Sequence, residues 1–149
     1  MISKQNIREL INQKLKDSDA LISKRRYGTA FYISGYALEL ALKLKICKIF
    51  KFTQGFPENK IEFQYYQNTV KQNQLLSKTI KNIQDIRNHD LNKLLFYSGA
   101  EYKVRLNLII EWAAVVDWNP EMRYKIIKIK KQATVYKLNA LKSIIKKIL

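Results

Sequence analysis

His89 is the sole histidine of this 149-residue chain and the residue best suited to acid-base chemistry. An imidazole titrates near neutral pH, so it could accept or donate a proton. Arg87 could stabilise an anionic transition state, but on a helix it would point roughly 200° away from His89. A loop would remove that restriction. The structural alternative is that Asp90 caps a helix and His89 packs beside it.

A second set of polar side chains lies in the most apolar stretch of the sequence. Within residues 29–44 the only charged residues are Glu39 and Lys43, which stand one helical turn apart. Apolar positions surround the rest of this predicted helix, so it should be buried. A buried carboxylate needs a partner. We therefore expect Glu39 to accept a hydrogen bond from Lys43, Arg26 or Arg123.

The chain is strongly basic, with 28 lysine and arginine residues against 12 acidic residues and a formal net charge of +16. Between Glu121 and Leu149, nine basic residues accompany one acidic residue. This surplus favours an anionic partner such as nucleic acid. The alternative is that the lysines form only a solvated surface. The predicted contacts to nucleic acid are Lys125, Lys128, Lys130, Lys131, Lys142 and Lys146.

The apolar pattern predicts an all-α fold, a bundle of about five helices. Hydrophobic residues make up 47% of the chain, whereas glycine (4) and proline (2) are rare. Asp90 and the Asn119-Pro120 pair are signals for helix starts, and Gly99 is a signal for a helix end. Residues 58–73 lack a clear period and are predicted to form a loop or an irregular insertion. The predicted helices cover residues 3–24, 28–49, 91–98, 101–117 and 134–149, with a short helix before Asn88.

The predicted 101–117 helix should pack one apolar face into the core. Its apolar residues recur at the helical period, and polar residues fill the positions between them. The positions expected to be buried are Val104, Leu108, Ile109, Trp112 and Val115.

Cysteine and histidine usage limits other chemistries. Cys47 is the single cysteine, so no internal disulfide can form, and one cysteine with one histidine cannot make a zinc site within the chain. We expect no metal, no cofactor and a cytoplasmic location. The N-terminal residues carry charge in every turn, and no apolar run reaches the roughly 20 residues of a transmembrane helix. No membrane association is therefore predicted.

Three groups of residues, in order along residues 26–124, resemble the HEPN family (higher eukaryotes and prokaryotes nucleotide-binding). The chain length fits one domain, so we predict a single HEPN-like helical domain over residues 1–149, and the charge pattern adds a basic C-terminal helix. The resemblance assigns Arg26, Tyr36, Glu39, Lys43 and Arg123 to the binding of a nucleotide or RNA. The matching residues are Arg26-Tyr27, Gly28-Thr29-Ala30, Gly35-Tyr36-Ala37, Glu39 and Leu42-Lys43; then His89-Asp90-Leu91 with Leu94-Leu95; then Trp118, Pro120, Arg123 and Tyr124.

The resemblance also implies partners and an activity. Proteins of this kind are similar to partners of minimal nucleotidyltransferases in toxin-antitoxin or phage-defence systems, and they commonly form homodimers. HEPN ribonucleases cleave RNA without a metal, with arginine and histidine spaced roughly four to six residues apart on one helix. This chain departs from that spacing, because Arg87 stands two residues before His89.

Three functions therefore remain open. The first is a protein that binds a nucleotide or RNA. The second is a ribonuclease toxin in which His89 works with Arg87 or with an arginine that the fold or a second subunit brings close. The third is a protein-interaction module whose basic tail docks on an acidic protein.

Overall fold

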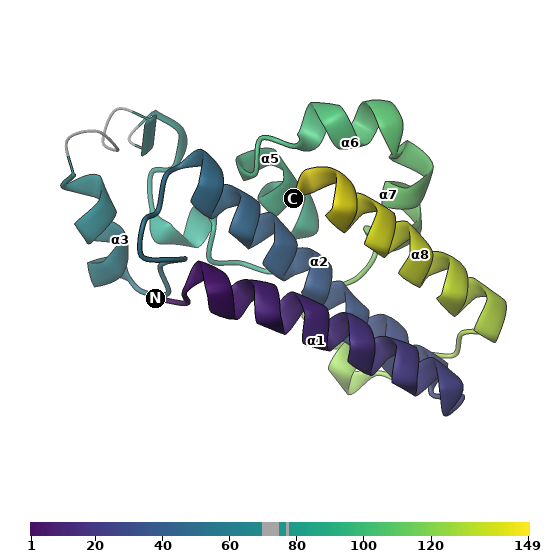
Figure 1. Ribbon diagram of the computed structural model, residues 1–149. Coiled ribbons are helices and arrows are strands. Elements are labelled where there is room, and N and C mark those ends of the chain that lie inside the picture. Colours follow the sequence, from purple (N-terminus) through teal and green to yellow (C-terminus); the bar gives the residue numbers. More distant parts are fainter. Residues whose placement is uncertain (70–74, 77) are drawn as a thin grey trace.

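Residues 1–69, 75–76 and 78–149 are described by the computed structural model, and they form helices but no β-strand. The first two helices pack side by side (Figure 1). α1 (Lys4–Ser23) begins where the Ser3 hydroxyl accepts a hydrogen bond from the Asn6 amide at 3.0 Å. The chain turns at Arg25, which has a φ of 59°, and continues as α2 (Tyr27–Ile49).

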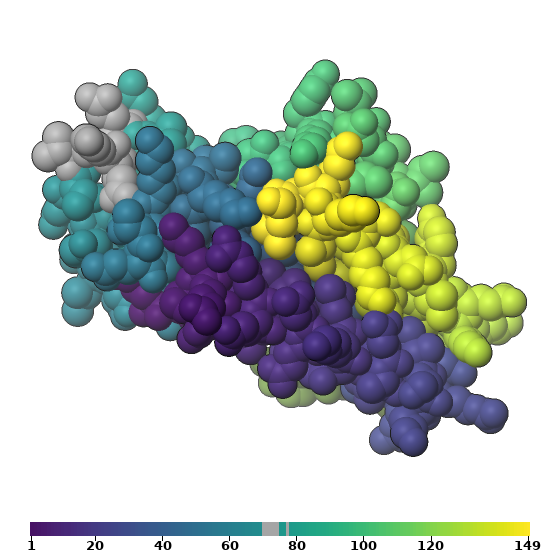
Figure 2. Space-filling view, in the orientation of Figure 1, coloured from purple at the N-terminus to yellow at the C-terminus, as the bar shows by residue number. Residues whose placement is uncertain are grey.

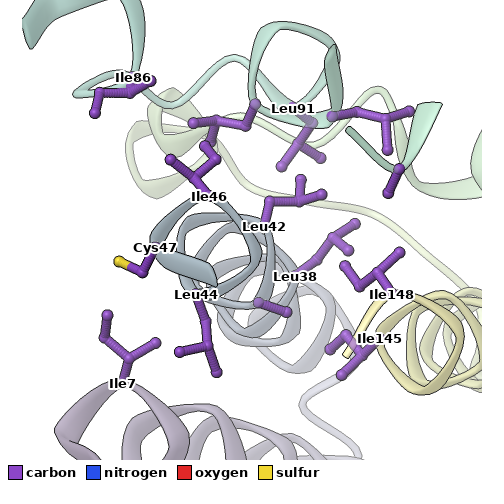
Figure 3. Close-up of a cluster of buried hydrophobic side chains, with 14 of the residues drawn as sticks. Ile7, Leu38, Leu42, Leu44, Ile46, Cys47, Ile86, Leu91, Ile145 and Ile148 are labelled. Carbon is purple, nitrogen blue, oxygen red and sulfur yellow. The ribbon is translucent and has the colours of Figure 1, made fainter. Parts of the chain in front are cut away.

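α2 lies in the middle of the bundle because apolar side chains cover nearly its whole circumference. It packs against α1, against α8 (Lys131–Ile148) and against α5 (Leu91–Tyr97). Cys47 lies in this core, where burial raises the pKa of its thiol to about 12 and leaves it an unreactive apolar group. Figure 3 shows the side chains of Leu38, Leu42, Leu44 and Ile46 of α2 surrounded by Ile7, Ile86, Leu91, Ile145 and Ile148.

Short helices lie along one edge of this bundle and at one of its ends. α6 (Glu101–Asn107) and α7 (Ile109–Val115) form the edge, where α7 packs against α8. α3 (Lys60–Gln67) and the 3₁₀ turn η1 (Ile83–Asp85) lie toward the end that contains the N-terminus (Figure 1). The chain is tied there by an isolated antiparallel bridge between Ile2 and Phe56 and by the buried Tyr66 hydroxyl, which donates to the Gly55 carbonyl at 2.9 Å.

A 3₁₀ helix and an extended segment return the chain to the start of α2. η2 (Pro120–Tyr124) begins where the Asn119 side chain accepts a hydrogen bond from the Glu121 amide. Just before it, the buried Trp118 packs on Gly35 and donates from its Nε1 to the Tyr32 carbonyl at 2.9 Å. The extended segment 125–130 then passes the first turn of α2 so closely that a Cβ on Gly28 would lie 2.5 Å from the Ile127 carbonyl oxygen.

The all-α bundle is confirmed, but the predicted number of about five helices is too low, because the described residues contain seven α-helices. The predicted loop over residues 58–73 was wrong in part, since it contains α3, which begins where the Asn59 side chain accepts from the Glu62 amide. Residues 70–73 of that prediction lie outside the described residues. The short helix predicted before Asn88 is replaced by helical residues at 75–76 and 78–79 and by η1.

The predicted 101–117 helix is interrupted. Leu108 has φ −141° and ψ 34°, which are not helical, so α6 ends and α7 begins at this residue. Val104, Trp112 and Val115 are buried as predicted, but Ile109 is 57% exposed because it follows the break. The predicted cap of α5 is confirmed: the Asp90 side chain accepts from two backbone amides, and Gly99 follows the helix with a φ of 65°.

Within the described part of the chain, none of the helices combines the length and apolar character that crossing a bilayer requires.

We predict that Gly35→Ala destabilises the protein, although replacing a helical glycine by alanine normally stabilises it by about 1 kcal/mol. A Cβ at this position would lie 2.1 Å from Trp118 Nε1, and overpacking of this kind costs roughly 1–3 kcal/mol. Urea unfolding would measure the change. Ala113→Gly is the control: at this exposed position of α7, the change in unfolding free energy reports the difference in helix propensity between alanine and glycine without a packing effect. A stabilised Gly35→Ala protein would contradict the close packing of Trp118.

Candidate functional site

Glu39 of α2 is the centre of a buried polar cluster. It is only 3% exposed, and both of its carboxylate oxygens have partners. Oε1 accepts a hydrogen bond from Lys43 Nζ at 2.5 Å, and Oε2 lies 2.9 Å from His89 Nδ1. The expected bond from Lys43 is thus confirmed, and His89 is a further partner that the sequence did not indicate.

His89 combines a fixed orientation with access to solvent. Its Nδ1 is bound to Glu39, whereas its side chain is 54% exposed. A carboxylate that accepts from Nδ1–H leaves Nε2 as the nitrogen that can take up a proton. The arrangement of carboxylate and imidazole is therefore one that suits a general base.

Arg87 shares a cavity of about 320 Å³ with His89, Lys43 and Glu58. Residues 86–88 form a turn and bend, so the helical geometry that would separate Arg87 from His89 by roughly 200° does not apply here. The structure therefore removes the geometric argument against the Arg87–His89 pair. Asn88 holds the bend, because its side chain accepts from the Asp90 amide and donates to the Gln84 and Asp85 carbonyls.

Tyr32 and Tyr36 precede Glu39 at helical spacing, so they lie on the same side of α2. The hydroxyls of Tyr32 and Tyr36 are 2.9 Å apart, and the Tyr36 ring contacts Trp118 edge to face at a centroid distance of 4.9 Å. Burial, the bond to Tyr32 and the charge of Glu39 raise the pKa of Tyr36 to about 12. Tyr36 therefore stays neutral over the physiological pH range. Its contact with Trp118 holds the residues just before η2 against α2.

A cavity of about 590 Å³ opens at the first turn of α2, and several cationic side chains line it. Its lining comes from the α1–α2 turn, from α2 and from residues 122–129. Within the described part of the chain, no carboxylate lines it and none of its cations forms an ion pair with one. The five cationic residues in its lining are Arg25, Arg26, Arg123, Lys125 and Lys128. We call this cavity the basic cavity.

Backbone and aromatic groups add to the character of the basic cavity. Arg26 is the N-cap of α2 and makes no side-chain cap hydrogen bond, so the amides of the first turn add the positive end of the helix dipole. Tyr27 and Tyr32 contribute to the lining. Arg123 stacks on Tyr124 at 4.7 Å from the ring centroid, and Tyr124 is largely exposed beside the cavity.

The predicted ligand-binding residues do not form one site but are divided between the basic cavity and the cluster of Glu39, Lys43 and His89. Arg26 and Arg123 lie together in the basic cavity, whereas Glu39 and Lys43 belong to the cluster with His89, and Tyr36 lies between the two. Arg25 and Tyr32 also line the basic cavity, and the sequence pattern had not indicated either residue. The Lys24-Arg25-Arg26 run at the end of α1 was a signal that could have indicated Arg25.

The predicted nucleic-acid contacts are divided as well. Lys125 and Lys128 line the basic cavity. Lys130 and Lys131 stand at the start of α8, and Lys146 is exposed near its end. Lys142 pairs with Asp19 of α1 at 2.8 Å, which compensates its charge.

Comparison of the chain with protein-family models, with curated proteins and with solved structures finds no match. The HEPN resemblance thus stays a hypothesis, and the features that bear on function are the cluster of Glu39, Lys43 and His89 and the basic cavity.

We predict that Glu39→Ala lowers the free energy of unfolding by on the order of 3 kcal/mol, because it leaves the mostly buried Lys43 ammonium without its partner. Urea unfolding at neutral pH would measure it. Glu101→Ala is the matched control, since it breaks an exposed i,i+4 pair with Arg105 and should cost roughly 0.5 kcal/mol or less. Replacing Glu39 and Lys43 together by leucine should cost less than Glu39→Ala. Equal losses for Glu39→Ala and Glu101→Ala would contradict the burial of the charge.

Proposed function

We propose that the protein binds single-stranded RNA or a nucleotide through phosphate groups in the basic cavity. The observation that supports the proposal is the gathering of five cations, with no carboxylate among the described lining residues, around a cavity of about 590 Å³. Cavities of roughly 300–1,000 Å³ are typical of ligand sites. Guanidinium groups bind phosphates in a bidentate manner, and the exposed Tyr124 ring offers a face on which a base can stack.

Electrostatics favours the basic cavity over the cluster at His89 as the phosphate site. The lining of the His89 cavity includes Lys43 and Arg87 but also Glu58, and Lys43 is already paired with Glu39. The basic cavity has no such compensation. A phosphate therefore gains more from the cations at the start of α2 than from those near His89.

Arg26→Glu and Arg123→Glu should each weaken binding of a labelled single-stranded RNA at least about tenfold, because a repulsive charge replaces a phosphate contact. Fluorescence anisotropy at several salt concentrations would measure this. With about five phosphate contacts, log affinity for the wild type should fall against log salt with a slope of roughly −3.5. A rise in melting temperature on adding a nucleotide would identify the smaller ligand.

Lys146→Glu is the control for net charge. It changes the charge by the same amount on the exposed side of α8, near the C-terminal end of that helix. This end of α8 lies beside the C-terminal end of α2, where Lys48 donates a hydrogen bond to the Leu149 carbonyl. Given the rise of a helix, the C-terminal end of α2 is about 30 Å from Arg26. Equal losses for Lys146→Glu and Arg26→Glu, or an affinity independent of salt, would contradict binding in the basic cavity.

The hydrogen bond between Glu39 and His89 favours a second candidate function, metal-independent RNA cleavage. We propose for this candidate that His89 Nε2 takes the proton of a 2′-hydroxyl, whose oxygen then bonds to the adjacent phosphorus and forms a 2′,3′-cyclic phosphate. The bond from phosphorus to the 5′-oxygen breaks, and this oxygen leaves as a hydroxyl after it takes a proton from water. Arg87 would stabilise the negative charge that develops on the phosphorane. Glu39 would act as a positioning residue, because it holds Nδ1 and stabilises the imidazolium.

Cleavage by this route should persist in EDTA, leave cyclic-phosphate ends and fall by about 10²–10⁴ in His89→Ala. Gel assays with a single-stranded and a structured RNA would show it. Arg26→Glu serves as the separating control, since it should weaken binding in the basic cavity without removing the base. RNA that stays intact with both the wild type and His89→Ala would leave binding as the function.

The HEPN resemblance suggests a partner protein and a biological system for this function. Similar proteins are partners of minimal nucleotidyltransferases in toxin-antitoxin or defence systems, and we propose the same kind of partner here. Co-purification with a nucleotidyltransferase encoded beside this chain would support this setting over the third hypothesis, the acidic-protein module.

A further inference from the structure

A further cavity, of about 520 Å³, lies between the 3₁₀ turn η1 and α5, and we call it the η1–α5 cavity. Four residues on one side of α5 line it, whereas the leucines of this helix are buried in the core. The volume is within the range of roughly 300–1,000 Å³ that is typical of small-molecule sites. The lining includes Asp85 of η1 and Asn92, Lys93, Phe96 and Tyr97 of α5.

The aromatic residues of α5 give this cavity an exposed ring. Phe96 is 58% exposed, although its helix packs against α2. The Phe96 ring contacts the Tyr97 ring edge to face at a centroid distance of 5.2 Å, and this contact restricts its orientation. An aromatic ring that is held in place and open to solvent offers a face on which a planar heteroaromatic ring can stack.

Three polar groups in the lining have no hydrogen-bond partner among the described residues. Asp85 Oδ2 accepts from two backbone amides at 2.9 and 3.0 Å, which leaves Oδ1 free. Asn92 Oδ1 accepts from Trp112 Nε1 at 3.3 Å, and because an indole N–H only donates, the Nδ2 amino group of Asn92 is the one that remains free. The third group is the hydroxyl of the half-buried Tyr97. Burial and the charge of Asp85 raise the pKa of Tyr97, so its hydroxyl stays protonated near the Asp85 carboxylate.

The free groups favour a guanine base as the ligand. A carboxylate oxygen only accepts hydrogen bonds, whereas an amide nitrogen only donates them. Guanine carries two adjacent N–H donors, at N1 and N2, and next to them the carbonyl acceptor O6, so one edge of the base matches both Asp85 and Asn92. Adenine has an acceptor at N1, which the carboxylate would repel. Lys93 balances the charge of Asp85, so the described lining carries no net charge and favours a neutral base over a phosphate.

We propose that the η1–α5 cavity binds a guanine base. The base stacks on Phe96, donates from N1 and N2 to Asp85 Oδ1 and accepts at O6 from Asn92 Nδ2. None of the described residues lines both this cavity and the basic cavity. A guanine base can therefore bind here whether or not a phosphate binds there.

Guanosine is the probe, because it carries the base without a phosphate. In an NMR titration of the full chain, the amide signals that shift should come from residues 82–85 and 92–97. Adenosine and inosine should each bind at least about tenfold more weakly, because adenosine lacks the donor at N1 and inosine lacks the amino group at N2. An excess of inorganic phosphate, which would compete for the basic cavity, should leave guanosine binding unchanged.

Phe96→Ala and Asp85→Asn should each weaken guanosine binding at least about tenfold, because the first removes the stacking face and the second replaces an acceptor by a donor. Asparagine keeps one oxygen for the two backbone amides that Asp85 binds, and circular dichroism would confirm that both variants are folded. Tyr136→Ala is the matched control and should not change the affinity. Tyr136 is 52% exposed and does not line the cavity, and it belongs to α8, whose yellow-green to yellow surface faces the viewer in Figure 2.

The absence of guanosine binding at millimolar concentration, an equal affinity for adenosine, or competition by inorganic phosphate would overturn the proposal. So would a loss of affinity in Tyr136→Ala as large as that in Phe96→Ala. A single-stranded RNA with one guanine, compared with the same strand carrying adenine in its place, identifies the source of the base. A preference for the guanine strand that Phe96→Ala abolishes supports a site for a base within RNA, whereas a preference confined to guanosine supports a site for a free nucleoside.

Discussion

The central constraint in this structure is that α2 is apolar on almost every side and must be covered on every side. α1, α5 and α8 each bury one part of its surface, and α6 and α7 pack on α8 in turn. Gly35 is the place where this covering requires the absence of a side chain, because the Trp118 ring occupies the position of a Cβ. This contact holds Trp118 on α2 just before η2, and residues 122–129, which follow, line the basic cavity.

Glu39 is the exception to the apolar surface of α2, and its burial has consequences beyond its own helix. A carboxylate in the core requires donors for both oxygens, and only Lys43 comes from the same helix. The second donor is His89, which lies in the loop before α5 and is drawn to α2 by this bond. The same interaction that compensates a buried charge therefore also orients the imidazole. Stability and a potential chemical site depend here on one hydrogen bond.

The sequence predicted the parts of the fold that follow from local rules. The helical period located α2 and α8, Asp90 and Asn119-Pro120 marked helix starts, and the lone carboxylate of α2 implied a paired partner. It did not predict the break at Leu108, where no glycine or proline interrupts the pattern and the apolar residues on both sides fit a continuous helix. Nor could it predict that Arg25, Arg123 and Lys128 meet, because the fold brings them together from distant segments.

The distance along α2 between the basic cavity and the cluster at His89 limits which ligands can reach both. Arg26 and Glu39 are thirteen residues apart in the sequence, which corresponds to about 20 Å along a helix. Between them lies a hollow whose lining includes Asp90, Asp117 and Glu121, so a phosphate would be repelled on the direct path. A mononucleotide cannot occupy both places, and only a strand of several nucleotides could reach from one to the other. Binding in the basic cavity and proton transfer at His89 are thus physically separable, which means that loss of one does not require loss of the other.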